Sequence, residues 1–235
     1  MGTIINAAAI VVATLIGMTF KKSLSERIQH SIMLVLGLAL AVLSIGWFMS
    51  DFLVVEEGGL STRYDLLVIV SLVVGTLIGE KTDIDGRLRR FANGIEKRYD
   101  LPPVAQGFIS GTLIFCIGAM AILGAFQDGL DGDMTTLLVK SVLDFITAMM
   151  LASVFGIGVM FAAVSVLIYQ GSITVAAYYA GMFLTEPMIL TMSMVGNILL
   201  VAMGINFMKL KDIKVANMLP ALLVPIVYFV ILHFF

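Results

Sequence analysis

The chain has 235 residues, of which 60% are apolar and only 13% are charged, and its formal net charge is −2. Its mean hydropathy of +1.07 excludes an ordinary water-soluble domain and indicates that much of the chain is surrounded by lipid. The single cysteine, Cys116, excludes an intramolecular disulfide.

Apolar runs of membrane-spanning length follow one another from the first residues to the last. A helix needs about 20 apolar residues to cross the hydrocarbon core, and only helices or closed barrels satisfy their backbone groups there. Residues 145–185 contain no Asp, Glu, Lys or Arg, which is too long a run for one crossing. We therefore predict an all-α polytopic membrane protein with one integral domain over residues 1–235. About eight transmembrane helices are expected, or seven if residues 135–171 cross fewer times, at 3–20, 29–50, 65–80, 104–126, 135–153, 155–171, 187–208 and 215–234.

The charged residues between these spans are strongly segregated by sign. Twelve of the fourteen basic residues fall in three short connections, and the connections between them are acidic. Basic connections are retained on the cytoplasmic side, so we expect these three inside and both termini outside. An odd number of crossings must then separate the acidic loop at 128–134 from the basic loop at 209–214. Residues 173–186 are accordingly predicted to form a re-entrant or interfacial segment, ended by Glu186-Pro187.

The second basic connection has the pattern of an amphipathic helix over residues 84–98. Ile84, Leu88, Phe91 and Ile95 recur at helical spacing, and the basic residues occupy the remaining faces. A helix of this kind lies on the anionic cytoplasmic leaflet as an anchor. The alternative is a partner-binding or regulatory element.

Two self-similarities indicate internal repeats. Residues 14–17 and 76–79 are both TLIG, and residues 115–120 (FCIGAM) resemble residues 155–160 (FGIGVM). Both members of the second pair lead to a Gln near a Gly, at Gln127 and Gln170. The glycines of these segments allow close helix contact, or they interrupt the helices, as in secondary transporters built from repeats.

Lys140 and Asp144 are the clearest ionisable residues inside a predicted span, and they lie four positions apart on one helix face. Asp144 lies about 14 Å from a span start at Thr135, which is near the middle of the bilayer. An unpaired charge there costs at least about 2.5–3.5 kcal/mol. A purely structural ion pair removes that cost. Alternatively, Asp144 faces a water-accessible path and binds a cation or exchanges a proton.

Other polar residues within or beside the spans extend this candidate site. Gln127, Asp128, Gln170 and Ser172 are expected to lie at similar depth because of the second repeat. The candidate substrate- or ion-binding residues are Asp144, Lys140, Gln127, Asp128, Gln170, Ser172, Asn6 and Asn197, with Glu80 as a candidate gate. Neither histidine has Cys, Asp or Glu at metal-ligand spacing, so no metal site is predicted.

The segments that carry these features resemble the YdfK/YqgA-like bacterial membrane proteins. The resemblance rests on residues 115–129, on Lys140-Ser141 with Asp144, on residues 156–159 (GIGV) and on residues 169–172 (YQGS). The two ends of the chain, residues 2–6 (GTIIN) and 214–220 (KVANMLP), look like the ends of that family. The family is a domain of unknown function, so the resemblance implies a polytopic protein of the bacterial inner membrane. It implies no substrate and no site residues.

These observations give three functional hypotheses. The leading one is a small transporter of an ion or polar solute, coupled to a proton or sodium gradient at Asp144, and by analogy a homodimer. The second is a cation channel whose outer mouth is formed by Asp128, Asp131 and Asp133. The third is a non-transporting scaffold or regulator acting through the helix at 84–98. Because no nucleophile–base pair, phosphate loop or metal-hydrolase motif occurs, we expect no enzymatic activity, no cofactor and no nucleic-acid partner.

Overall fold

The computed structural model describes residues 1–21, 25–56, 59–99, 104–117, 119–130, 132–180 and 185–234. The chain divides into two compact units. Unit 1 comprises Met1–Leu34 and Gly86–Phe183, and unit 2 comprises Val35–Asp85 and Leu184–Phe235. Each unit therefore combines segments that are far apart in the sequence. The single integral domain expected from the sequence stays a prediction.

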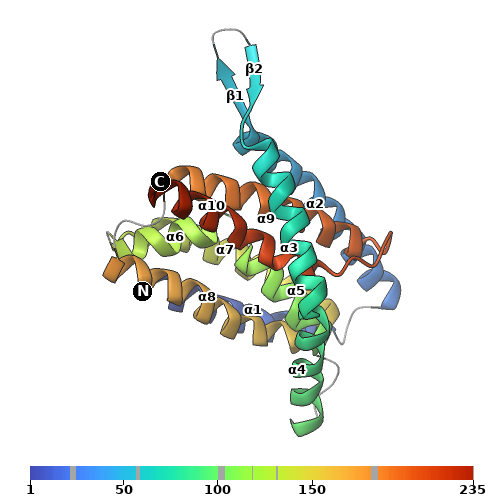
Figure 1. Cartoon of the computed structure of the whole chain (residues 1–235). Helices are drawn as coiled ribbons and strands as arrows, with labels where there is room; N and C mark the ends of the chain where they lie inside the picture. The colour runs from blue at the N-terminus through green and yellow to red at the C-terminus, as the bar shows by residue number, and fades with distance from the viewer. Residues whose placement is uncertain are drawn as a thin grey trace. The chain divides into compact units, whose positions relative to one another are not determined.

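Unit 1 is built around five helices: α1 (Gly2–Lys21), α5 (Ala105–Cys116), α6 (Ala119–Leu130), α7 (Thr135–Phe155) and α8 (Gly158–Ala180). It also contains the start of α2 (Glu26–Phe52) and nearly all of α4 (Ile84–Tyr99). Helix α1 packs mainly along α7, and α8 packs against α1, α5 and α6. The N-terminus lies beside the ends of α6 and α8 (Figure 1). The first helix thus packs against two helices, α7 and α8, from the middle of the chain.

Close backbone contact between α1 and α7 depends on a glycine. A Cβ atom at Gly17 would lie 2.3 Å from the carbonyl oxygen of Met149 and 2.9 Å from the Cβ of Ala152. No side chain fits in that space, because real Cβ contacts are longer than 3.0 Å. The absence of a side chain lets the two helices approach closely, as is common in membrane bundles.

The FCIGAM and FGIGVM segments both coincide with interruptions of helical structure. Helix α5 ends at Cys116, and α6 leaves the break at an angle of 61° to it. Gly118 lies outside the described residues. Helix α7 ends at Phe155, and Gly156, with φ +73°, makes the turn into α8. Left-handed backbone of this kind favours glycine. Whether the two segments descend from a duplication stays a prediction.

Unit 2 contains most of α2, the hairpin β1 (Leu53–Glu56) and β2 (Gly59–Thr62), α3 (Asp65–Thr82), α9 (Glu186–Phe207), the 3₁₀ helix η1 (Val215–Leu222) and α10 (Leu223–Phe234). The two strands are antiparallel, and Leu53 pairs with Thr62. The hairpin was not expected, because its segment was predicted only as an acidic connection. Arg63 fixes its base by donating from Nε to the carbonyl oxygen of Asp51 at 2.8 Å.

Helix α3 and η1 form the tightest contact in unit 2. Cβ atoms at Gly75 and Gly79 would lie 2.1 Å from the backbone nitrogen of Ala221 and 1.7 Å from the carbonyl oxygen of Asn217. Pro220 lies inside η1, where a proline breaks α-helical hydrogen bonding. Pro220 thus lies in a 3₁₀ segment, and α10 follows it directly.

The prediction of an all-α polytopic membrane protein is confirmed. Among the described residues, six segments are long and apolar enough to cross a membrane: α1, α2, α7, α8, α9 and residues 215–232. The bent pair α5 and α6 makes a seventh if it counts as one span. The remaining expected span, 65–80, coincides with α3, which carries Asp65, Glu80 and Lys81 near its ends.

The prediction of a separate re-entrant or interfacial segment at 173–186 is wrong over its described part. Residues 173–180 are the last turns of α8, which is a continuous helix of 23 residues. At 1.5 Å per residue, α8 is about 34 Å long, enough for one crossing without a separate segment. Helix α9 begins at Glu186, and residues 181–184 lie outside the described residues.

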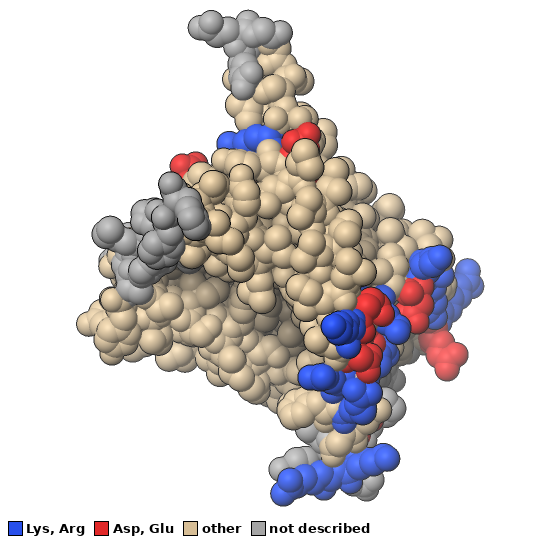
Figure 2. Space-filling model, in the orientation of Figure 1, with Lys and Arg blue, Asp and Glu red and all other residues tan. Residues whose placement is uncertain are grey.

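Helix α4 occupies the range in which the sequence predicts an amphipathic helix. Basic side chains gather along it in the face shown in Figure 2. Its Glu96 carboxylate accepts hydrogen bonds from the N–H groups of Val104, at 2.5 Å, and Ala105, at 3.0 Å. Glu96 therefore caps the N-terminus of α5, which links this helix to the transmembrane part of unit 1. Its position on the membrane surface stays a prediction.

We expect Glu96→Ala to lower the free energy of unfolding by about 0.5–2 kcal/mol, the usual cost of losing a helix cap. Glu96→Gln keeps one acceptor oxygen and should lose less. Thermal unfolding of the purified protein in detergent measures both values. Equal losses in the two variants would contradict capping by the side-chain oxygen.

Candidate functional site

Lys140 and Asp144 form a buried ion pair in the middle of α7. The Lys140 ammonium donates to Oδ2 of Asp144, as expected for residues four positions apart on one helix. Lys140 is 5% exposed and Asp144 is 7% exposed. The two charges therefore neutralise each other within the protein, as the structural alternative requires.

Two amide side chains complete this polar cluster from neighbouring helices. Asn6 of α1 donates from Nδ2 to Oδ2 of Asp144 at 3.0 Å and to Oε1 of Gln170, in α8, at 3.3 Å. Asn6 and Gln170 are both fully buried. We call Asn6, Lys140, Asp144 and Gln170 the buried polar cluster. The structure thus unites four of the predicted site residues from three helices.

The cluster is incompletely satisfied. Oδ1 of Asn6 and Nε2 of Gln170 are buried and have no hydrogen-bond partner among the described residues. A buried polar atom without a partner costs about 1–3 kcal/mol. The cluster therefore retains one acceptor and one donor able to bind a further polar group.

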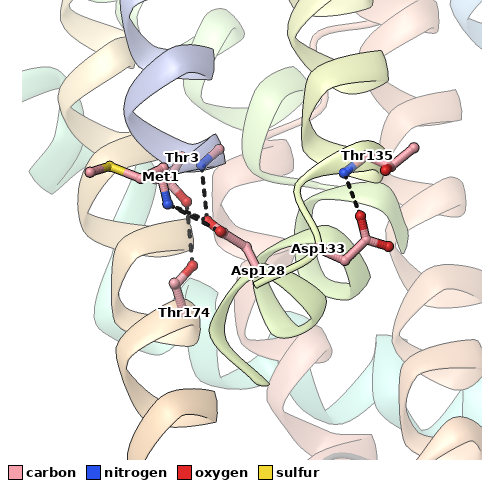
Figure 3. Close-up of polar contacts among 7 residues, drawn as sticks. Met1, Thr3, Asp128, Asp133, Thr135 and Thr174 are labelled. Atoms are coloured by element: carbon pink, nitrogen blue, oxygen red, sulfur yellow. Dashed lines mark hydrogen bonds and ion pairs between the residues drawn. The ribbon is translucent and has the colours of Figure 1, made fainter. Parts of the chain in front are cut away.

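A line of polar contacts leads from the cluster to the end of the bundle where the chain begins. Thr3 and Thr174 lie one turn from Asn6 and Gln170, and their hydroxyl oxygens are 3.4 Å apart. Beyond them, the Met1 amine donates to both carboxylate oxygens of Asp128, at 3.1 and 2.9 Å (Figure 3). Asn6 lies five positions after Met1, a distance of about 7.5 Å along the helix. We call these contacts the polar seam.

The break between α5 and α6 lies close to the ion pair. Cys116 ends α5 and is close enough to Lys140 and Asp144 to interact electrostatically with both. Discontinuous helices expose backbone groups that regular helices pair internally. In many transporters these groups contribute to a substrate site near the middle of the membrane.

Two other predicted residues lie outside the cluster. Gln127 accepts a hydrogen bond from the Thr136 hydroxyl at 2.7 Å, which links α6 to α7. Ser172 is exposed, and its hydroxyl donates to the carbonyl of Tyr169 within α8. Residues two positions apart on a helix do not face the same direction, so Ser172 cannot accompany Gln170. The second repeat predicts a similar depth for Gln127, Asp128, Gln170 and Ser172, but these residues do not form one shared site.

Asn197 and Glu80 belong to unit 2, where each has its own hydrogen-bond partners. Nδ2 of Asn197 donates to the Ser193 hydroxyl at 3.4 Å, and Ser193 donates to Asp51 at 2.5 Å. Glu80, the predicted gate, accepts a hydrogen bond from Asn217 at 2.9 Å. Its role as a gate stays a prediction.

The acidic loop expected to form a channel mouth contains carboxylates with separate local partners. Asp128 is buried and also accepts the N–H of Gly2 at 3.0 Å. Asp133 accepts the N–H of Thr135 at 2.9 Å (Figure 3). Hydrogen bonds from the Thr135 backbone and hydroxyl hold the pKa of the exposed Asp133 below its ordinary value. Asp131 lies outside the described residues.

Comparison with known proteins identifies the family. The profile of the family described as "Protein of unknown function (DUF554)" matches residues 1–230. The chain belongs to this family. It is 33% identical over 234 residues to the uncharacterized membrane protein YdfK of Bacillus subtilis, covering 100% of this chain and 97% of YdfK. It is 31% identical over 230 residues to the uncharacterized protein YqgA of Escherichia coli, covering 95% of this chain and 93% of YqgA. No solved structure matches.

The family relationship confirms the resemblance found in the sequence and the membrane character of the chain.

Thr3 and Thr174 were not among the predicted site residues, although the sequence contained a signal for them. Thr3 precedes Asn6 by three residues and Thr174 follows Gln170 by four, which puts each threonine on the face of its neighbouring amide. No group of three or more His, Cys, Asp or Glu residues that could hold a metal ion occurs among the described residues.

Proposed function

We propose that this protein is a small secondary transporter of the bacterial inner membrane. In this proposal unit 1 moves an ion or small polar solute, and a proton or sodium gradient drives the movement through Asp144. The observation that carries the proposal is the buried polar cluster with its two unpartnered atoms. The proposal includes no enzymatic activity.

Stability alone does not account for such a cluster. Replacing a buried ion pair by apolar residues of similar size is often neutral or stabilising. A network retained for structure also gains most when all its members are satisfied, whereas Asn6 and Gln170 each keep an unpartnered atom. Ionisable residues within transmembrane helices commonly mark ion or proton pathways. These considerations favour a functional role for Lys140 and Asp144.

The polar seam and the helix break support a route to the cluster. The polar seam connects the end of unit 1 at Asp128 with Asn6 and Gln170. The break after Cys116 brings the end of α5 near Lys140 and Asp144. Charge segregation assigns the loop at 128–134 and the N-terminus to the outside. The contact between Met1 and Asp128 supports that assignment, because it requires both to lie at one end of unit 1.

The homodimer expected from the sequence belongs to the same proposal. The described residues include six or seven segments that are long and apolar enough to cross a membrane, which is few for both a moving part and a fixed scaffold. A second copy would supply additional scaffold. Cross-linking in native membranes tests this element separately from transport.

We expect Asp144→Asn to abolish the coupling of uptake to a proton or sodium gradient in proteoliposomes, because an amide cannot exchange a proton or carry the charge that couples two fluxes. Uptake is measured across a panel of inorganic cations, inorganic anions and organic acids, with protein-free vesicles as the blank. Asp133→Asn is the matched control, because it makes the same chemical change at an exposed helix cap.

The outcome separates the three hypotheses. A transporter loses coupled uptake in Asp144→Asn and keeps it in Asp133→Asn. Flux that is uncoupled from any proton or sodium gradient in Asp133→Asn as well as in Asp144→Asn identifies a channel and contradicts the proposal. The same is true of a wild-type protein that moves no member of the panel, which favours the scaffold or regulator.

A further inference from the structure

The Asp144 carboxylate of the buried polar cluster is bound by nitrogen donors. The ammonium of Lys140 and Nδ2 of Asn6 both donate to the same oxygen, Oδ2 of Asp144. A third donor, Nε2 of Gln170, belongs to the amide whose Oε1 contacts Asn6, and it has no partner in the described part of the chain. Two nitrogen donors, from α7 and α1, thus bind the Asp144 carboxylate, and a third, from α8, belongs to the amide next to Asn6.

This arrangement matches the recognition of an anion better than that of a metal cation. Sodium sites in transporters are built from oxygen ligands, including backbone carbonyls. Here Oδ1 of Asn6 is the fully buried side-chain acceptor without a partner among the described residues, and the ammonium of Lys140 repels any cation close to Asp144. Ammonium and amide donors form their strongest hydrogen bonds with carboxylates and other anions.

We propose that Asp144 occupies an anion-binding site in this state, and that its protonation releases Lys140 and Asn6, which together with Nε2 of Gln170 then bind a small monovalent anion that is transported together with the proton. This inference rests on the proposed function and names its substrate class. A small carboxylate is the closest match, because the group now bound to the donors is a carboxylate.

The charge balance of this step is simple. One proton binds to Asp144, whose carboxylate becomes a neutral carboxyl group and gives up the ammonium of Lys140. One anion then binds to that ammonium. The cluster is neutral before the step, with one ammonium and one carboxylate, and neutral after it, with one ammonium and one bound anion. Neither state buries an uncompensated charge, which would be costly inside the membrane.

Few other titratable groups face Asp144. On α7 the partner is Lys140, and from α5 the thiol of Cys116 interacts with both charges. Tyr169 of α8 interacts in turn with Cys116. Helix α1 carries charged groups only at its two ends, Met1 and Lys21. The acidic residue of the polar seam is Asp128, and its charge is neutralised by the Met1 amine.

Transport of one proton with one monovalent anion moves no net charge. Wild-type protein in proteoliposomes should therefore accumulate L-lactate or chloride about tenfold at equilibrium for each pH unit of inward proton gradient. A potential set with valinomycin and potassium should leave this accumulation unchanged. Radiolabelled L-lactate and chloride are the anion probes, and sodium and rubidium, tested in vesicles without valinomycin, are the cation probes.

Variants identify the groups involved. Asp144→Asn imitates the protonated carboxyl, so anion uptake should persist, lose its dependence on pH and become responsive to the membrane potential. Lys140→Gln should lose anion uptake, and so should the double variant Lys140→Gln/Asp144→Asn, which buries no charge and serves as the folded control. Size-exclusion profiles establish which variants are folded. The wild-type measurement remains decisive if Asp144→Asn does not fold.

The results distinguish failure of the proposed anion site from failure of the proposed transporter. Uptake of sodium or rubidium without uptake of either anion overturns the anion site and leaves the transporter in place. Anion uptake that responds to the potential in the wild type, or that remains coupled to pH in Asp144→Asn, has the same consequence. Failure of every probe to enter overturns the anion site together with the transporter.

Discussion

Removing one charge of the Lys140–Asp144 pair should lower the free energy of unfolding by about 3–5 kcal/mol, because the remaining charge is left buried without a partner. Both side chains are at most 7% exposed, so water cannot replace the lost partner without rearrangement. Lys140→Met and Asp144→Leu are the variants with the largest expected effect. Thermal unfolding in a mild detergent, followed by loss of helical circular dichroism, measures the change.

The double variant Lys140→Met/Asp144→Leu separates pairing from packing. It removes both charges and keeps side chains of similar length, so most of the stability of the wild type should return. Non-additivity of this size is expected for two residues in direct contact. If the double variant is as unstable as the sum of the single ones, the ion pair is not the main interaction of these side chains. Transport measured on the stable double variant then reports function free of a folding defect.

The ion pair was predictable because its two members share one helix. A spacing of four residues fixes the relative direction of two side chains whatever the rest of the fold does. Asn6 and Gln170 are different, because they reach Asp144 from α1 and α8. Their presence in apolar spans indicated polar contacts, whereas the partner of each depends on how three helices pack. No single-sequence pattern specifies that packing.

The two clearest departures from expectation have a common cause. The boundary placed near 171 relied on loop charges and parity, yet no charged residue or proline interrupts α8 before Ala180. The hairpin β1–β2 lies in a connection for which only the charge was considered in the prediction. Charge statistics describe which side of the membrane a loop occupies. They carry no information on the length of the adjoining helix or on local backbone pairing.

Gly79→Ala and Gly75→Ala should each reduce stability by about 1–3 kcal/mol or more, the cost of overpacking a filled contact. The added Cβ atoms would lie 1.7 Å and 2.1 Å from backbone atoms of η1, and backbone cannot move aside as a flexible side chain does. Separating α3 from η1 would also break the hydrogen bond from Asn217 to Glu80. Thermal unfolding of each variant measures the loss.

Gly46→Ala in α2 is the matched control for this pair, because nothing lies within 4 Å of the added methyl group. That substitution should leave stability unchanged or raise it by up to about 1 kcal/mol, since alanine favours helix more than glycine does. The contrast isolates helix contact from helix propensity, which the three substitutions change in the same direction. Equal stability of Gly79→Ala and Gly46→Ala would show that α3 and η1 do not touch at Gly79. A large loss of stability in Gly79→Ala, with none in Gly46→Ala, establishes that the small size of Gly79 allows α3 to pack against η1. That contact brings Glu80 and Asn217 together.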